Sequence, residues 1–142
     1  MTAIACRDGV MAADTMTLYG PSEFKLNTPK IIEKDGYLIG SAGNACPSNE
    51  DIVDWFFKAQ YPLPKFEGAS FYLLVLTPEK KMEIWDSESG TKDLVPSKFW
   101  AIGSGADVCM GAMEAGATAE EAVKAAIKWC PKVGGKVVSK KI

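Results

Sequence analysis

The sequence predicts an α+β fold, with strands, one helix, further strands, two helices and a last strand in that order. Three observations support this prediction: short apolar runs separated by glycine-containing turns, two helical patterns near the end, and a hydrophobic content of 47%. A chain of 142 residues buries about two thirds of the surface that its unfolded form exposes. Because no repeat or dividing linker interrupts the chain, we expect one domain over residues 1–142.

The first half predicts two hairpins followed by a single helix. In each hairpin, extended apolar stretches flank a turn with an Asp-Gly pair, Asp8-Gly9 in the first and Asp35-Gly36 in the second. The segment Tyr61-Pro62-Leu63-Pro64 ends the helix, and residues 62–68 lead to the next strand. The predicted strands cover residues 2–6, 10–14, 30–34 and 37–43, and the predicted helix covers residues 48–59.

The second half predicts three strands, two helices and a last strand. Gly116 ends the first of these helices, as a glycine in the left-handed conformation often does. Thr118 and Glu121 form a capping box at the start of the second helix, and Pro131 stops it. We expect strands over residues 70–77, 82–86 and 99–102, helices over 105–115 and 119–130, and a last strand after Gly134-Gly135. In the second helix, the side chains that we expect to face the core are Ala122, Val123, Ala126, Ile127, Trp129 and Cys130.

Composition excludes several classes of function. The chain has no histidine, so a serine or cysteine nucleophile lacks its usual base and zinc lacks its commonest ligand; we predict neither metal nor cofactor. A net charge of −2 offers no basic surface for nucleic acid. No apolar run approaches the roughly 20 residues that cross a bilayer. Gly103-Ser104-Gly105 lacks the spacing of a phosphate loop, so we do not expect nucleotide binding. The four cysteines have no CxxC spacing, which predicts reduced thiols in a cytoplasmic protein.

Thr2 is a candidate nucleophile that needs no histidine. If Met1 is removed, the α-amine of Thr2 has an unperturbed pKa of about 8 and can take the proton from its own hydroxyl. Nucleophile and base then share one residue. While Met1 remains attached, the same nitrogen is an amide and no base is present.

Five separated motifs resemble the proteasome β-subunit family, and most closely the bacterial HslV-type ring protease, both N-terminal-nucleophile hydrolases. The motifs are Thr2-Ala3-Ile4, Gly9-Val10-Met11-Ala12-Ala13-Asp14, Lys30 at sixteen residues beyond Asp14, Ala42-Gly43, and Ala101-Ile102-Gly103-Ser104-Gly105. The resemblance implies a four-layer αββα sandwich, here shortened by about one helix. It also implies hydrolysis of peptide bonds.

The resemblance implies a role for each of five residues. Thr2 is the nucleophile, and Lys30 lowers the proton affinity of its hydroxyl and keeps the α-amine neutral. Asp14 holds Lys30 charged and oriented, the N–H of Gly43 supplies the oxyanion hole, and Ser104 hydrogen-bonds near the Thr2 amine. This assignment requires that Lys30 Nζ lie within hydrogen-bond reach of the Thr2 side chain.

The resemblance also implies a substrate pocket and partners. The pocket residues are uncharged, which leads us to expect a preference for apolar residues before the cut. We expect a homo-oligomeric ring that degrades peptides or unfolded proteins, with a separate ATP-dependent unfoldase as a possible partner. The pocket residues are Thr17, Thr28, Ile32, Ser41 and Ala45; candidate contact residues, which alternatively only cover the sheet, are Trp55, Phe56, Phe57 and Tyr61.

Departures from the family pattern keep a second interpretation open. No late Asp and Ser match those that usually surround the nucleophile's amine, and only one helix fits after Ala42-Gly43. The alternative is a non-catalytic subunit of the same fold with an assembly or scaffold role, like the α-type chains of the proteasome. A non-peptidase amide hydrolase is a third possibility.

Overall fold

The computed structural model describes residues 2–43, 48–58 and 70–142. Within these ranges the chain is α+β, as predicted, and every strand pairing is antiparallel. The elements are β1 (Ile4–Arg7), β2 (Val10–Asp14), β3 (Met16–Tyr19), β4 (Phe24–Asn27), β5 (Ile31–Lys34), β6 (Tyr37–Gly43), α1 (Asn49–Lys58), β7 (Phe71–Leu76), β8 (Met82–Asp86), β9 (Thr91–Leu94), β10 (Phe99–Ile102), α2 (Ala106–Glu114), α3 (Ala119–Trp129) and β11 (Val137–Lys141).

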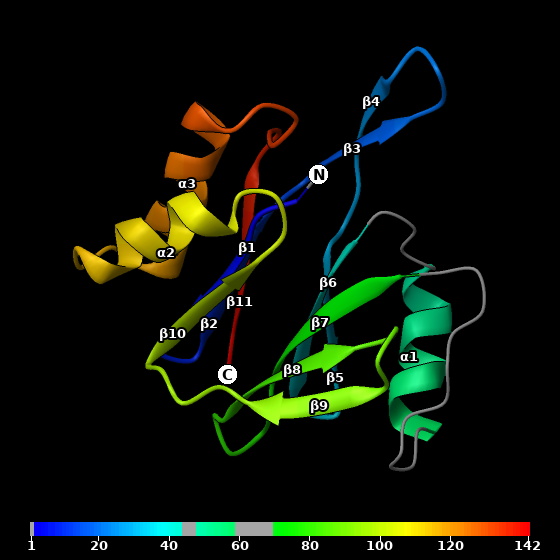
Figure 1. Cartoon of the computed structure of the whole chain (residues 1–142), viewed down its shortest axis with the longest axis vertical. Helices are drawn as coiled ribbons and strands as arrows, with labels where there is room; N and C mark the ends of the chain where they lie inside the picture. Colours follow the sequence, from blue (N-terminus) through cyan, green and yellow to red (C-terminus); the bar gives the residue numbers. More distant parts are fainter. Residues whose placement is uncertain (1, 44–47, 59–69) are drawn as a thin grey trace.

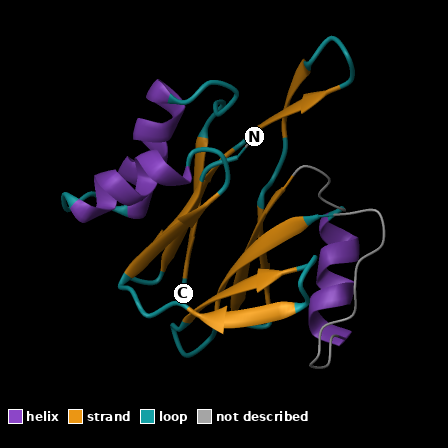
Figure 2. Cartoon of the chain, viewed as in Figure 1, coloured by secondary structure: helices purple, strands orange, loops and turns teal. Residues whose placement is uncertain are grey.

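The two larger sheets face each other, and the described helices lie on their outer sides. The first sheet has the strand order β10-β1-β2-β11, and the second has the order β5-β6-β7-β8-β9. Figure 1 shows α2 and α3 beside the first sheet and α1 beside the second, and Figure 2 shows the same arrangement by element type. The first and last strands of the chain therefore belong to one sheet, with β11 paired to β2.

Strand alternation divides the apolar residues among three clusters. In β1, Ile4 and Cys6 face the second sheet, whereas Ala5, and Ala3 just before the strand, face α2 and α3. The small alanines on that outer face, joined by Ala122, Val123 and Ala126 of α3, pack the helices close to the strands. A third cluster fills the space between the second sheet and α1, with Ile39, Ile52, Phe56, Phe71, Leu73, Val75 and Trp85 buried in it.

The two Asp-Gly turns, the glycine after α2 and the capping box of α3 are confirmed. Asp8 and Gly9 have φ values of 53° and 76°, and Asp35 and Gly36 have 52° and 81°, which is the geometry of a type I′ hairpin turn. The Thr118 hydroxyl accepts from the N–H of Glu121, whose carboxylate accepts from the N–H of Thr118, so the capping box is complete. Gly116 has a φ of 105° just after α2.

One core prediction for α3 is wrong. Trp129, at the end of the helix, is 71% exposed, and the ammonium of Lys128 lies over its ring. Ala122, Val123 and Ala126 are buried as predicted, while Ile127 and Cys130 are half-buried. Trp129 is the last residue of α3, and the buried face of this helix ends at Ala126.

A third hairpin was not predicted. β3 and β4 pair only with each other among the described strands, and every residue of β4 is exposed. The large apolar side chains of this hairpin face solvent. The sequence therefore lacks the alternation of buried and exposed residues that would have indicated its strands. Tyr19 is 57% exposed, Phe24 69% and Leu26 49%.

The aromatic residues of α1 mostly cover the sheet. Phe56 is buried, and its ring lies 4.5 Å from that of Trp85 and 5.3 Å from that of Tyr37. Trp55 packs edge-on against Phe71 and Trp85. Only Phe57 keeps a sizeable exposed fraction, 36%. Tyr61, the predicted helix end at residue 59 and the predicted connection at residues 62–68 lie outside the described residues.

The described part of the chain contains three free cysteines and no membrane-length helix. Cys6 and Cys109 are buried and Cys130 is half-buried, while Cys46 lies outside the described residues. None of the described helices combines the length and the apolar character that spanning a bilayer requires.

Candidate active site

Lys30 lies between Thr2 and Asp14, immediately before β5. Its Nζ donates to Thr2 Oγ1 at 3.3 Å, to Asp14 Oδ1 at 2.9 Å and to the carbonyl oxygen of Met16 at 2.7 Å. The side chain is only 8% exposed. The distance that the catalytic assignment requires, Lys30 Nζ within hydrogen-bond reach of the Thr2 hydroxyl, is therefore present.

Asp14 is a fully buried carboxylate with donors on both oxygens. Oδ1 accepts from the N–H of Ala3 at 3.0 Å as well as from Lys30, and Oδ2 accepts from the N–H of Gly134 at 3.2 Å. A buried charge is tolerated only when it is paired and hydrogen-bonded, and both conditions hold here. Asp14 thereby joins β1, the start of β5 and the segment before β11 at a single point.

The segment Gly103-Ser104-Gly105 holds the backbone of Thr2. The Thr2 nitrogen donates to Ser104 Oγ at 3.2 Å, and the N–H of Gly105 donates to the Thr2 carbonyl oxygen at 3.0 Å. Gly103 has a φ of 96°, and a Cβ added there would lie 2.8 Å from the Thr2 carbonyl carbon. Only glycine permits this close approach.

Gly43 lies at the end of β6, where it borders two hollows that also contain Thr2. A Cβ at Gly43 would lie 2.7 Å from the Cα of Phe71 on the neighbouring strand, so this position also admits only glycine. Gly43 belongs to the second sheet and Thr2 precedes β1 of the first, and both line the same two hollows.

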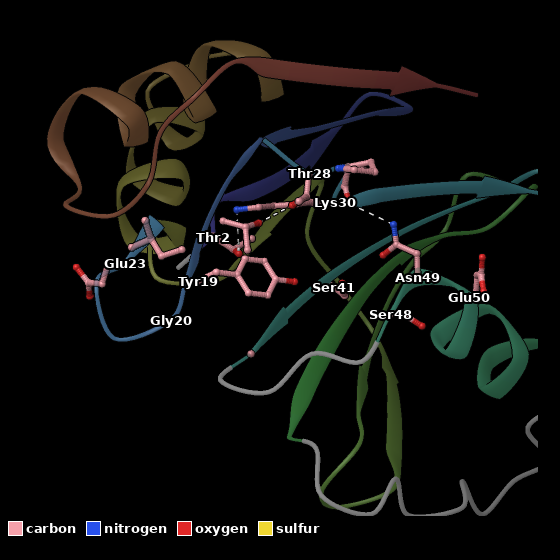
Figure 3. A pocket seen from close by; sticks show the side chains of 14 residues that line it. Thr2, Tyr19, Gly20, Glu23, Thr28, Lys30, Ser41, Ser48, Asn49 and Glu50 are labelled. Carbon is pink, nitrogen blue, oxygen red and sulfur yellow. Dashed lines mark hydrogen bonds between the residues drawn. The ribbon is translucent and has the colours of Figure 1, made fainter. Parts of the chain in front are cut away.

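The larger hollow has a volume of about 750 Å³. Three of the five predicted pocket residues, Thr17, Thr28 and Ser41, line it. Ile32 does not: it packs against the cluster beneath α1, because β5 alternates and its neighbour Ile31 faces the opposite sheet. Ala45 lies outside the described residues. Figure 3 shows that the β3–β4 hairpin, with Tyr19, Gly20 and Glu23, forms one wall and Ser48, Asn49 and Glu50 form another.

Sequence reasoning missed Met16 and Gly134. Both act through the backbone, Met16 by accepting from Lys30 and Gly134 by donating to Asp14, so neither side chain carries a signal. The Gly134 carbonyl also accepts from the N–H groups of Thr15 and Met16. The Gly-Gly pair before the last strand was the only trace of this contact in the sequence.

The arrangement suits nucleophilic chemistry by a hydroxyl. An ammonium that is held by a buried carboxylate lies against Thr2 Oγ1, where it stabilises negative charge that develops on that oxygen. Among the described residues, no three His, Cys, Asp or Glu side chains gather as they would around a metal ion.

No protein-family model and no curated protein sequence matches the chain. Solved structures do match it. BPH from Thiobacillus denitrificans is 20% identical with a TM-score of 0.69, and the match covers 99% of this chain and 96% of that chain. The same protein in complex with epoxomicin matches with a TM-score of 0.68, 20% identity, and 99% and 97% coverage. Eukaryotic HslV from Trypanosoma brucei is 16% identical with a TM-score of 0.69, over 98% and 97% of the two chains. The chain thus has the proteasome-like fold of the HslV and BPH proteins.

Proposed function

We propose that the chain is a threonine-type endopeptidase whose nucleophile, Thr2, becomes competent when Met1 is removed. The observation that carries the proposal is the contact of Thr2 Oγ1 with Lys30 Nζ, which Asp14 holds in turn. The proposal includes the four-layer αββα sandwich of N-terminal-nucleophile hydrolases, which the position of the helices on the outer sides of the two larger sheets supports.

Each step of the proposed reaction uses a group described above. Thr2 Oγ attacks the carbonyl carbon of the scissile peptide, and its proton passes to the Thr2 α-amine. Lys30 stabilises the charge on Oγ, its nearby ammonium favours the neutral amine, and the N–H of Gly43 stabilises the oxyanion. The amine hands its proton to the leaving nitrogen, the C–N bond breaks, and an ester on Thr2 remains. Water hydrolyses this ester, releasing the acid and restoring the hydroxyl.

Ser104 has a supporting part in this proposal. Its Oγ accepts from the Thr2 nitrogen and so orients the amine lone pair toward the hydroxyl. The late Asp and Ser of the family pattern are missing from the sequence, and the contact from Ser104 supplies one hydrogen bond at the same nitrogen. We therefore favour catalysis over the scaffold alternative.

The proposed function also includes assembly into a ring, a class of substrate and a partner protein. We propose that copies of the chain form a cytoplasmic ring that encloses the sites and degrades peptides or unfolded proteins. The supporting observation is the likeness over nearly the whole length to HslV. A separate ATP-dependent unfoldase would feed such a ring. Light scattering on the purified chain measures the number of copies, and a monomer would contradict the ring.

The decisive experiment is the intact mass after exposure to a peptide epoxyketone, which needs both the free amine and the hydroxyl of an amino-terminal threonine. We expect a mass without Met1 that carries one adduct. Thr2→Ala should form none, whereas Thr2→Ser should still form it. A second preparation, in which a cleavable leader is removed to leave Thr2 first, makes the test independent of Met1 processing. If that preparation also stays unlabelled, the non-catalytic subunit is the better interpretation.

A further inference from the structure

The position of the Thr2 nitrogen separates an acyl side and a leaving side of the site. The amine must protonate the leaving nitrogen, so the leaving part of the substrate lies on the side of that amine. Ser104, which contacts the Thr2 nitrogen, lines the smaller hollow of about 370 Å³ together with Gly103 and Tyr72. The larger hollow, on the side of Lys30, is therefore the place for the side chain that precedes the cut.

Most of the described residues that line the larger hollow are polar. Besides Thr2 and Tyr19, five of them carry a hydroxyl or an amide, and the only lysine among them is engaged by the buried Asp14. Figure 3 shows the phenol of Tyr19 extending from the hairpin toward Ser41. The apolar preference expected from the sequence does not fit this lining. The five polar residues are Thr17, Thr28, Ser41, Ser48 and Asn49.

Two carboxylates stand on opposite walls of the hollow, and their charges are not equally compensated. Glu23, on the hairpin wall, pairs with Lys132 at 2.9 Å, and both side chains are about half exposed. Glu50 lies in the first turn of α1 on the other wall, and among the described residues it forms no ion pair. The unpaired charge that faces a substrate in this hollow is thus negative.

We propose that the larger hollow selects peptides with lysine or arginine before the cleaved bond, with Glu50 as the main specificity-determining residue and Glu23 as a second. This inference rests on the proposed peptidase function and names its substrate class. The long alkyl stem of such a side chain packs along the Tyr19 ring, whose face attracts a cation, while its charged head extends toward Glu50 on the opposite wall.

Three peptides that differ only in the residue before the cut test the proposal, with arginine, leucine or glutamate at that position. The measured quantity is the ratio of kcat/KM for the arginine peptide to that for the leucine peptide. We expect a ratio above one that falls with added salt, because the charges are solvent-accessible. The glutamate peptide should be the poorest of the three.

Two variants should move this ratio in opposite directions. Glu50→Gln removes the unpaired charge, and the ratio should fall by about fivefold, the discrimination expected of an exposed charge pair. Lys132→Gln releases Glu23 from its partner and should raise the ratio. Glu120→Gln is the matched control, because Glu120 is an exposed residue in the first turn of α3, away from both hollows.

The outcomes separate the two proposals. If the preparation with Thr2 first takes up no epoxyketone and cleaves none of the peptides, the peptidase function itself is contradicted. If it cleaves the leucine peptide best, and neither Glu50→Gln nor Lys132→Gln changes the ratio, only the basic specificity is overturned.

Discussion

At the scale of single residues, the site depends on a buried ion pair and on glycines that permit close approach. Asp14 is fully buried, and three donors reach it from segments far apart in the sequence. Gly103 allows the backbone of Thr2 to lie against it. The same residues therefore determine the geometry of the site and contribute to the stability of the fold.

Removing the charge of Lys30 should destabilise the fold as well as the site. Lys30→Met leaves the carboxylate of Asp14 buried without its counter-ion, a loss of about 3 kcal/mol. Chemical denaturation measures it. The double variant Asp14→Asn/Lys30→Met should recover part of that loss, because an amide has no charge to bury. Equal losses in the single and double variants would show that the charge is not what matters.

Gly103→Ala should cost more stability than Gly116→Ala. Both glycines have a positive φ, 96° and 105°, so alanine pays a similar backbone strain of about 1–3 kcal/mol at each. At Gly103 the new Cβ also meets the Thr2 backbone, whereas at Gly116 nothing lies within 4 Å. Thermal unfolding of the two variants compares them, and the excess loss at Gly103 should appear together with lost epoxyketone labelling. Matching losses would remove the role assigned to the Gly103 contact.

At the scale of elements, α3 contains a titratable cap. The N–H and hydroxyl of Thr118 hydrogen-bond with Glu121 and lower the pKa of this carboxyl from its ordinary 4.5. The folded chain therefore releases this proton more readily than the unfolded chain. The stabilisation is complete above the ordinary pKa and is lost as the pH falls through the lowered value.

Glu121→Gln should flatten this part of the pH dependence. Glutamine can still accept from the Thr118 N–H but does not titrate, so wild type and variant should diverge above pH 5 and converge at low pH. Stability measured by urea denaturation between pH 2 and pH 7 checks this, with Glu120→Gln as the neighbouring control. A constant difference across the range would show that the carboxylate charge does not contribute.

The elements also show what the sequence could predict. Asp-Gly turns, the Thr118 capping box and the alternation in β1, β2 and β6 are local signals, and each element lies where it was expected. The β3–β4 hairpin and β9 were not predicted. Exposed strands such as Thr91–Leu94 have no buried face, so their sequences lack the apolar alternation that predicts a strand. In the site, side chains such as Thr2 and Lys30 could be named, whereas the backbone groups of Met16 and Gly134 could not.

At the scale of the whole molecule, one of the two described buried cysteines lies on each side of the first sheet. Cys6 belongs to the cluster between the two sheets, and Cys109 belongs to the cluster beneath α2 and α3. Burial raises the pKa of each thiol to about 12, and nearby Cys130 and Asp14 add to the effect at Cys109. At pH 8 only about one such thiol in ten thousand is the reactive thiolate.

If residues 1–142 form one domain, as the sequence predicts, Cys6 and Cys109 should resist alkylation in the native state and become reactive together in urea. Mass spectrometry of iodoacetamide-treated protein gives both rates, with half-buried Cys130 as the internal comparison. Labelling of Cys109 at much lower urea than Cys6 would show instead that the helices separate from the sheet before the sheets part.

The hydrogen bond from Gly134 to Asp14 spans 120 residues of sequence. During translation, this bond cannot form until Gly134 has been added to the chain. A ribosome that adds about 5–20 residues per second needs about 6–24 seconds to reach Gly134 after Asp14 has been made. During that interval Thr2 and Asp14 have already been made, but the Asp14 carboxylate lacks the hydrogen bond from the N–H of Gly134. On the proposed function, the hydrogen bonding around Asp14 is therefore complete only after Gly134 has been made.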